Sequence, residues 1–471
     1  MSLNNPRVCI NSPANKFVPS LHIEVAIVGA GASGLSCALH LQDRGIECAV
    51  FERDDTPCGS TALSSGFIPA PCTRTQTSLN IKDSVELFVS DLRSKSKGEG
   101  SALLEQAYAS AIGPALDALE VSHGFDWEIL DDFLYPGHSV HRMHALPART
   151  GQALMARLMG RAQALGIPVL TRSLVNEIWM QDNKVIGVGI TRVDGSVERY
   201  SCDALVLCCN GYGGNPDLIG QYIPEMKDAV FAGHTGNDGS AILWGEGLGA
   251  ELADLGGYQG HGSWAVPHGI LITWALMMQG AIQVNSLGKR FHNETTGYSE
   301  AAVEVLKQPG AVAWCIFDEE IFQKGCTFPD FQAATQLAAI RRFADTASLS
   351  DYIGCTQESI SDTLAQIQTD LKTNDGLDAH TGRTFNKAIS APYYAVKVTG
   401  ALFHTQGGLS VNDQARVLMK NGHALENLFA AGGAARGVSG NAVWGYLSGN
   451  GLLSAFAGAY IAACSIKASR N

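Results

Sequence analysis

The sequence predicts an α/β protein in which a second domain is inserted into a Rossmann-like domain. Three observations support this fold class. A glycine-rich turn, residues 29–34, joins an apolar strand to a helix. A second apolar run, residues 204–209, also ends in a glycine-rich turn, as is typical of a buried parallel strand at a ligand-binding sheet edge. Between Gly257 and Lys397 the pattern changes to helices and short strands, and a glycine-rich region follows at 400–451.

The first predicted elements are a strand, a turn, a helix and a second strand. The first strand covers 25–28, the helix runs from about Leu35 to Arg44, and the second strand, 48–51, ends on Glu52. Glycines in such a turn let the backbone approach a pyrophosphate, the helix N-terminus offers free N–H groups, and the acid is placed to bind a ribose. The pattern therefore predicts a dinucleotide held by Gly29, Ala30, Gly31, Ala32, Ser33, Gly34, Glu52 and Arg53.

Later elements follow from periodicity and composition. Helical periodicity predicts a helix over 151–165, and alternation predicts a strand hairpin from 169–178 and 185–191. The polar stretch 91–101 is expected to be an exposed loop, and the Ser/Thr/Asp-rich stretch 345–363 is expected to hold connections between elements.

The domain boundaries follow from these changes in pattern. Residues 1–21 are polar and rich in Pro and Asn, which predicts a loose N-terminal tail. Residues 22–256 and 404–471 are assigned to the Rossmann-like domain. Residues 257–403 form the inserted domain, for which we expect an α+β structure.

Composition excludes several classes of function. The net charge of −12 and a pI of about 5.5 argue against nucleic acid as a partner. The 12 cysteines are scattered without a CxxC motif, which predicts reduced thiols in a cytoplasmic protein and no metal site. No apolar signal segment opens the chain, and the apolar stretch Gly451 to Ile466 is taken as a buried helix too short to be a transmembrane segment.

Several segments carry a family resemblance. The turn Pro57 to Gly66 resembles the second flavin loop of the fumarate reductase/succinate dehydrogenase flavoprotein superfamily. Segments 209–215, 236–239, 285–294 and 404–453 agree with that superfamily in order and spacing. The resemblance covers residues 22–466 and implies an FAD-binding domain with an inserted capping domain and a substrate site over the flavin ring.

The resemblance also implies which residues bind FAD. Respiratory members attach FAD covalently through a histidine at the position of Ser60, so the FAD of this chain is expected to be bound non-covalently. Many members carry Glu at the position of Gly433. The turn before the last helix is expected to place N–H groups near the flavin pyrimidine. Further FAD contacts are implied for Gly59, Ser60, Thr61, Ser65, Gly66, Val175, Cys209, Asn210, Gly211, Asp238, Gly433, Gly451 and Leu452.

The substrate-binding positions depart from the fumarate reductase pattern. His261 and His404 match two histidines that hold a dicarboxylate in that family, and Thr273 matches a threonine that does so. The arginine that clamps the far carboxylate is replaced by Tyr446, and the proton-delivering arginine by Tyr298. A neutral hydroxyl cannot replace a charged bidentate partner, so fumarate and succinate become poor candidate substrates.

The two tyrosines instead resemble motifs of 3-ketosteroid dehydrogenases. In those enzymes the tyrosine at the position of Tyr298 removes a proton, and the one at Tyr446 binds the ketone oxygen together with the backbone N–H four residues later, here that of Asn450. The resemblance implies an α,β-desaturase of a cyclic ketone, either a 3-ketosteroid or an oxocyclohexane compound. Hydride would pass to flavin N5, and an external acceptor (quinone, O2 or a protein) would reoxidise the flavin.

Two alternatives remain open at this stage. The reverse reaction, C=C reduction of an enone or a fumarate-type acid, would need an external electron donor, because the chain contains no CxxCH haem motif. A flavin-binding protein without redox turnover is disfavoured, because two separate tyrosines match one mechanism.

Other polar and aromatic residues are expected to be structural. Arg142, His144 and Arg149 are expected to be solvated, and Arg290 and Glu294 to form a structural ion pair. An aromatic and methionine set is expected either to line the substrate pocket or to belong to the core. This set consists of Tyr258, Trp264, Trp274, Met277 and Met278.

Overall fold

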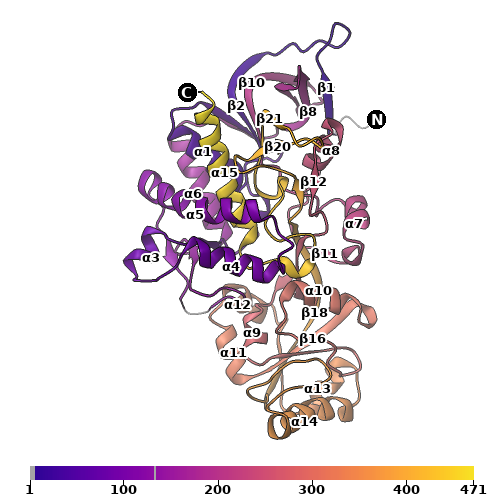
Figure 1. Ribbon diagram of the computed structural model, residues 1–471. Helices are drawn as coiled ribbons and strands as arrows, with labels where there is room; N and C mark the ends of the chain where they lie inside the picture. Colours follow the sequence, from indigo (N-terminus) through magenta and orange to yellow (C-terminus); the bar gives the residue numbers. More distant parts are fainter. Residues whose placement is uncertain (1–5, 132–133, 471) are drawn as a thin grey trace. The chain divides into compact units, whose positions relative to one another are not determined.

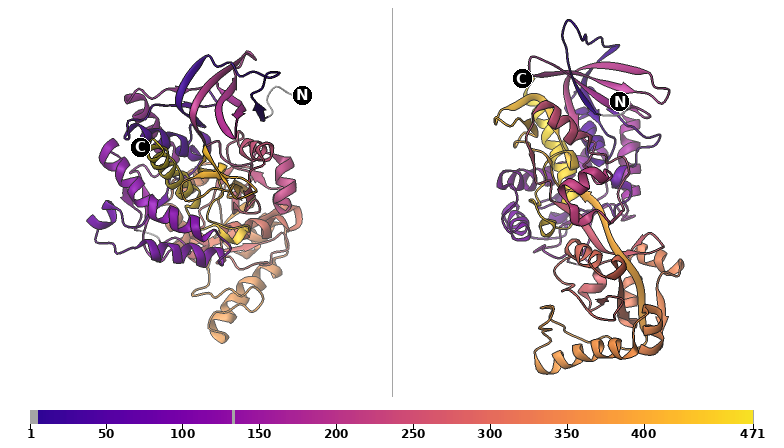
Figure 2. Two further views of the ribbon diagram at one scale, coloured as in Figure 1. Left: turned by 45° about the horizontal axis from the view of Figure 1, so that its top comes forward. Right: turned by 90° about the vertical axis from the view of Figure 1, so that its right-hand side faces the viewer.

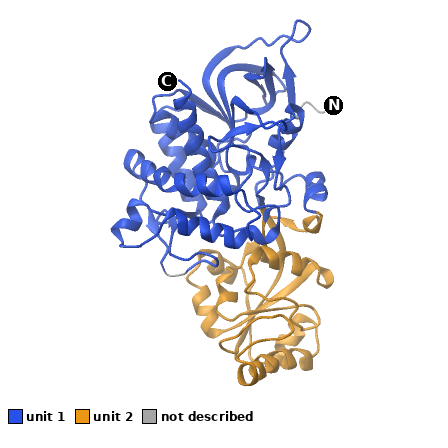
Figure 3. Ribbon diagram, viewed as in Figure 1, with its two compact units in different colours: residues 1–223, 233–258, 404–471 blue, residues 224–232, 259–403 orange. Residues whose placement is uncertain are grey.

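The computed structural model describes residues 6–131 and 134–470. The chain forms two compact units (Figure 3). Unit 1 consists of residues 1–223, 233–258 and 404–471, and unit 2 of residues 224–232 and 259–403. The short segment 224–232 was expected in the first domain but belongs to unit 2, where its strand β11 (Val230–Phe231) pairs in parallel with β18 (Tyr393–Thr405).

Unit 1 is built on a nine-stranded sheet with the order β1-β8-β9-β10-β2-β3-β7, to which β21 and β20 are added beside β10. The parallel centre is β10, β2 and β3, and β8, β9 and β10 form an antiparallel meander. The strands are β1 (Arg7–Ile10), β2 (Leu21–Val28), β3 (Cys48–Phe51), β7 (Val169–Leu170), β8 (Leu174–Gln181), β9 (Lys184–Thr191), β10 (Val197–Leu207), β20 (Arg416–Leu418) and β21 (Ala424–Ala430).

The expected loose tail contains a strand. β1 pairs in parallel with β8, with Val8 opposite Ile178. The polar composition of this segment suits the edge of a sheet, where one side of a strand stays in solvent.

Long helices pack beside this sheet. They are α1 (Ala32–Gln42), α4 (Val85–Ser96), α5 (Ala102–His123), α6 (Gly151–Ala164) and α15 (Asn450–Ala468). Helix α15 runs beside α1 and α5 in Figures 1 and 2. Smaller elements of unit 1 are α2 (Gly59–Ala62), β4 (Ile68–Pro69), α3 (Arg74–Ser78), β5 (Glu128–Ile129), β6 (Met143–Ala145), α7 (Pro216–Tyr222), α8 (Ser240–Leu248), β12 (Leu252–Ala253), β19 (Gly408–Leu409), η3 (Gly432–Ala434) and η4 (Val443–Gly445).

Among the described residues, α15 is the one helix long and apolar enough to cross a membrane. The expectation that this stretch is too short was wrong, since the helix has 19 residues. Its side chains Leu453 and Phe456 are fully buried in the core of unit 1. Burial against α1 and α5 accounts for its apolar composition.

Unit 2 is an α+β unit with a seven-stranded sheet of order β14-β13-β18-β16-β15, in which β11 and β17 also pair with β18. The strands are β13 (Tyr258–Ala265), β14 (Ile270–Leu271), β15 (Ile282–Val284), β16 (Val312–Asp318) and β17 (Arg341–Phe343). The helices are η1 (Pro224–Met226), α9 (Ala275–Met278), α10 (Tyr298–Leu306), η2 (Pro309–Ala311), α11 (Glu319–Gly325), α12 (Pro329–Gln336), α13 (Thr346–Ile353) and α14 (Gln357–Thr373). Helices α13 and α14, which are labelled in Figure 1, pack against each other.

Two stretches expected to be loops are largely helical. Helix α4 reaches Ser96, so only the end of 91–101 is irregular, and α13 and α14 occupy most of 345–363. The polar residues that suggested loops partly serve as helix caps. Asp345 accepts a hydrogen bond from the Ser348 N–H, and Thr356 accepts one from the Ser359 N–H.

Candidate active site

The first glycine-rich turn positions an acidic side chain and a helix N-terminus side by side. Helix α1 begins at Ala32, three residues earlier than expected, so its first N–H groups lie within the turn. The Glu52 carboxylate, at the end of β3, accepts hydrogen bonds from the N–H of Ala30 at 2.9 Å and of Asp54 at 3.0 Å. These two bonds fix the direction of the carboxylate beside the turn.

The space at this turn fits a bound anion. Apart from chain neighbours, a Cβ on Gly31 would have one heavy atom within 4 Å, Thr61 Oγ1 at 3.8 Å. A Cβ on Gly59 would likewise meet only the Gly31 Cα, at 3.8 Å. The N-cap residue Gly31 gives helix α1 no side-chain cap. The Ala32 N–H donates to Thr61 Oγ1 at 3.2 Å, and the helix dipole favours a negative group at this end. The residues present therefore fit the pyrophosphate of a dinucleotide.

The second flavin loop and the segment 236–238 are tied together within unit 1. Ser60 Oγ accepts hydrogen bonds from Asn237 Nδ2 at 2.8 Å and from the His234 N–H at 3.2 Å. Arg53 and Asp238 form an ion pair at 2.7 Å. The predicted positions Arg53, Ser60 and Asp238 thus belong to one connected group of residues. The other predicted positions are Ser65 and Gly66 after α2, Val175 in β8, and Cys209 after β10, next to Gly29.

The glycine-rich turn after β10, which begins at Asn210, explains why position 433 is a glycine. Asn210 adopts a left-handed conformation (φ 63°), and its side-chain oxygen accepts the Gly211 N–H at 2.9 Å. A Cβ on Gly433 would lie 2.1 Å from that oxygen. Asn210 therefore leaves no room for a side chain at position 433.

A first cluster of candidate site residues lies in unit 1 at the start of α15. The rings of His404 and Tyr446 meet edge to face, with centroids 5.4 Å apart. A Cβ on Gly451 would lie 2.8 Å from the His404 ring, so the ring requires glycine there. Burial raises the pKa of Tyr446, although the backbone N–H groups of Gly451 and Gly449 lower it. Tyr446 is therefore a protonated hydroxyl, suited to donate a hydrogen bond.

Both histidines of the candidate site are neutral. Burial lowers the pKa of His404 to about 4 and that of His261 to about 3. Neither imidazole carries a charge near pH 7, so each can bind an oxygen only as a neutral donor.

The second cluster lies in unit 2. His261 stacks between two rings, with centroids 5.0 Å from Tyr298 and 5.7 Å from Phe403. Trp274 meets its edge at 5.6 Å. The His261 Nδ1 accepts the Ser263 N–H at 3.2 Å, which leaves the proton on Nε2. Tyr298 is the first residue of α10, directly after Gly297.

The predicted role of Asn450 requires a correction. Its backbone N–H was expected to bind a ketone oxygen, but it donates to the Leu447 carbonyl oxygen at 3.0 Å. The left-handed Gly449 (φ 89°) closes this tight turn before α15 and consumes the donor. The side chain of Asn450, which is fully buried, donates instead to Ser439 Oγ at 2.9 Å.

A family model that describes an FAD binding domain matches residues 24–452. The chain belongs to this family. It is an FAD-dependent oxidoreductase of the fumarate reductase superfamily that acts on CH–CH groups, and its cofactor is FAD. The expected α/β fold with an FAD-binding domain is confirmed.

Two fumarate reductases resemble this FAD-dependent oxidoreductase in sequence or structure, and a ketosteroid dehydrogenase resembles it in fold. The probable fumarate reductase Ifc3 of Shewanella frigidimarina (strain NCIMB 400) is 28% identical over 441 residues, which cover 92% of this chain and 73% of that protein. The open conformation of a flavocytochrome c3 fumarate reductase matches with a TM-score of 0.81 and 26% identity, covering 96% and 79% of the two chains. A 3-ketosteroid Δ4-(5α)-dehydrogenase from Rhodococcus jostii RHA1 shares the fold, with a TM-score of 0.75, 21% identity, and coverage of 98% and 99%.

Sequence reasoning missed some residues that organise this oxidoreductase. Gln406 and Ser439 link Asn450 to His404, and no motif marks either residue. The only available signal was that Gln406 follows His404 by two residues in the same extended segment. Arg142 and His144 were expected to be solvated, but both are fully buried.

The burial of Arg142 has a clear cause. Its guanidinium bonds both oxygens of Asp83 at 2.9 Å and also pairs with Asp91. His144 bonds Thr73 Oγ1 at 2.7 Å. The partners lie far away in the sequence, so the chain around residue 142 carries no local sign of them.

The expected ion pair of Arg290 with Glu294 is confirmed and is part of a larger network in unit 2. Glu294 is fully buried and forms ion pairs with Arg290 at 2.6 Å and with Arg383 at 2.9 Å. Arg290 also pairs with Asp378. Burial by itself raises the pKa of Glu294. The positive charges of Arg383 and Arg290 lower it by more, so the pKa falls to about 2.

Glu294→Gln is expected to destabilise the protein at neutral pH. Because the folded-state pKa lies below the unfolded value, the carboxylate stabilises the fold above about pH 5 and loses this effect as the pH falls toward 2. We expect the free energy of unfolding of the variant to be lower by ~3 kcal/mol at pH 7, with the difference shrinking at acid pH. Urea unfolding between pH 7 and about 3 measures it, and a difference that does not depend on pH would contradict this account.

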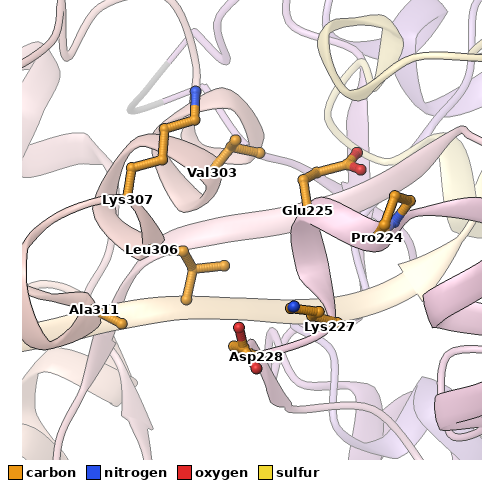
Figure 4. A pocket seen from close by; sticks show the side chains of 8 residues that line it. All are labelled: Pro224, Glu225, Lys227, Asp228, Val303, Leu306, Lys307 and Ala311. Atoms are coloured by element: carbon orange, nitrogen blue, oxygen red, sulfur yellow. The ribbon is translucent and has the colours of Figure 1, made fainter.

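Unit 2 also has a pocket of about 220 Å³ (Figure 4). It lies beside η1 and α10 and mixes charged with apolar side chains. None of the predicted site residues lines it, so it is not the candidate active site. Its lining residues are Pro224, Glu225, Lys227, Asp228, Val303, Leu306, Lys307 and Ala311.

Proposed function

We propose that this FAD-dependent oxidoreductase desaturates a cyclic ketone next to its carbonyl group. The observation that carries the proposal is the chemistry of the two clusters. Tyr298 stacks on a neutral His261, and Tyr446 meets a neutral His404. Neutral donors suit a ketone oxygen, whereas a dicarboxylate calls for cationic partners.

Tyr298 is the proposed base that takes the α proton of the ketone. Tyr446 is the proposed hydrogen-bond donor to the carbonyl oxygen, on which negative charge develops as the α proton leaves. The raised pKa of Tyr446 keeps its hydroxyl group protonated, which supports a role as hydrogen-bond donor and disfavours a role as base. Together the two hydroxyl groups supply the acceptor and the donor that enolisation needs.

FAD, when bound, supplies the two-electron acceptor for the β hydride, so that a C–C bond becomes C=C and the proton and hydride are both accounted for. The glycine cradle at Gly31 and Gly59, with Glu52 beside it, is proposed to hold the cofactor. Ser60 offers no imidazole for a covalent link, which supports non-covalent binding. A quinone, O2 or a protein is the proposed external acceptor.

The second candidate function is C=C reduction with electrons from an external donor. It is favoured by the 28% identity to a probable fumarate reductase. The two functions involve the same C–C bond and the same cofactor and differ in the direction of the reaction.

Anaerobic bleaching of the flavin absorbance separates these functions. The FAD-loaded protein is mixed with a 3-ketosteroid, 4-oxocyclohexanecarboxylate, cyclohexanone or succinate. Bleaching by a ketone and not by succinate is the expected result. Bleaching by succinate alone would overturn the proposal. If no compound bleaches the flavin, reoxidation of dithionite-reduced protein by enones or fumarate tests the reductase, and failure of both leaves a flavin-binding protein without turnover.

A further inference from the structure

A chain of buried side chains connects the N-terminus of α15 to His404 within unit 1. Asn450 Nδ2 donates to Ser439 Oγ at 2.9 Å, and Ser439 Oγ donates to Gln406 Oε1 at 2.8 Å. Gln406 Nε2 lies 3.0 Å from His404 Nδ1. The side chains of Asn450, Ser439 and Gln406 are buried, at most 4% exposed.

The chain has a direction. Ser439 has one hydroxyl proton, so it donates to Gln406 once it accepts from Asn450. Gln406 then presents its N–H to His404, and that N–H needs a lone pair on Nδ1. The opposite direction would leave the Asn450 Nδ2 unpaired, whereas the observed one leaves Asn450 Oδ1 unpaired. A buried unpaired acceptor costs less than a buried unpaired donor.

We propose that Asn450, Ser439 and Gln406 act as positioning residues that hold His404 as the Nε2–H tautomer, so that it presents a hydrogen-bond donor to the substrate oxygen. The proposal rests on the proposed function, because it adds a second donor beside Tyr446 at the same carbonyl oxygen. It also replaces the donor that the backbone of Asn450 cannot supply, since that N–H is bonded to Leu447.

The surroundings of His404 are consistent with this assignment. Among the described residues, Nε2 has no protein hydrogen-bond partner, so it is the ring atom left for a substrate. The one group that favours the other tautomer is the Thr405 carbonyl oxygen, 3.3 Å from Nδ1 and therefore farther away than Gln406. Tyr446 is the titratable side chain in ring contact with His404, and its raised pKa keeps it neutral.

The tautomer is measured directly by ¹⁵N NMR of the histidine side chains in the FAD-loaded protein. The His404 signal is assigned by its loss in His404→Gln. We expect an unprotonated Nδ1 and a protonated Nε2 in the wild type. A protonated Nδ1 would overturn the proposal whatever the protein's substrate proves to be.

Gln406→Glu tests the role of the chain in binding and rate. A carboxylate accepts but does not donate, so Nδ1 becomes protonated and Nε2 loses its proton. We expect ketone turnover at pH 8 to fall by ~10-fold or more. The carboxylate also raises the pKa of His404, and the imidazolium carries protons on both nitrogens. Activity relative to wild type should therefore recover as the pH falls toward about 6. A loss that is equal at all pH values would contradict the proposal.

Two serines give a matched control. Ser439→Ala interrupts the chain and should yield a mixture of tautomers with weaker ketone binding. Ser454 lies on α15, is likewise buried and has an Oγ without a hydrogen-bond partner, so Ser454→Ala should leave the tautomer and the KM unchanged. Equal effects of the two variants would overturn the proposal. If the tautomer responds as expected but no ketone is turned over, the positioning chain stands and the proposed function fails.

Discussion

Tyr298→Phe is expected to lower ketone desaturation by ~10²–10⁴-fold while FAD stays bound. The substitution removes the hydroxyl group proposed to accept the α proton and keeps the ring that stacks on His261 at 5.0 Å. FAD binding should be unaffected, because the glycine cradle lies in unit 1 and Tyr298 in unit 2. Steady-state turnover and the flavin content of the purified variant are the measurements.

A second measurement separates proton removal from hydride transfer. Exchange of the ketone α hydrogen with deuterated solvent, followed under anaerobic conditions, should be lost in Tyr298→Phe. Tyr352→Phe is the matched control, since this tyrosine of unit 2 lies in α13 and stacks on Phe343 at 5.1 Å. Turnover near that of the wild type in Tyr298→Phe would mean that another group is the base.

Tyr446→Phe is expected to lower kcat/KM for the ketone by ~10²–10³-fold through loss of one donor to the developing oxyanion. The ring contact with His404 is retained, so the change is confined to the hydroxyl group. The effect should appear in kcat as well as in KM, because the charge on the oxygen is larger in the transition state.

The pH dependence gives a further check on Tyr446. Since burial raises its pKa, the hydroxyl group should stay protonated from about pH 7 to 9, so ionisation of Tyr446 should not weaken ketone binding over that range.

If the kinetics of Tyr446→Phe equal those of the wild type, the residue does not belong to the proposed oxyanion site. A ketone affinity that falls in the wild type but not in Tyr446→Phe over this range would mean that Tyr446 ionises.

The sequence by itself determined the nucleotide-binding core. Residues 25–52 contain a strand, a glycine-rich turn, a helix and an acid within one short stretch, and the structure forms β2, α1 and β3 there. Local periodicity and glycine spacing suffice for such a unit, because its contacts are close in sequence. The antiparallel pairing of β8 with β9 followed for the same reason. The predicted first strand, 169–178, was wrong in its bounds, because residues 169–170 form the separate strand β7, which pairs in parallel with β3.

The tertiary structure alone decided features that depend on partners distant in sequence. Polar stretches became helices because capping side chains and packing outweigh composition. Arg142 is buried because Asp83 and Asp91 lie beside it in space. Gly433 carries no side chain because Asn210 fills its place.

In the candidate site, too, the sequence determined which residues take part and the tertiary structure determined their protonation and hydrogen bonds. Sequence spacing and family resemblance were enough to select Tyr298, Tyr446, His261 and His404. The state of each group came from its surroundings, since burial makes both histidines neutral. The turn at Gly449 directs the N–H of Asn450 to Leu447 and leaves its side chain to begin the chain that ends at His404. Protonation and hydrogen-bond direction depend on three-dimensional neighbours, and spacing along the sequence does not determine them.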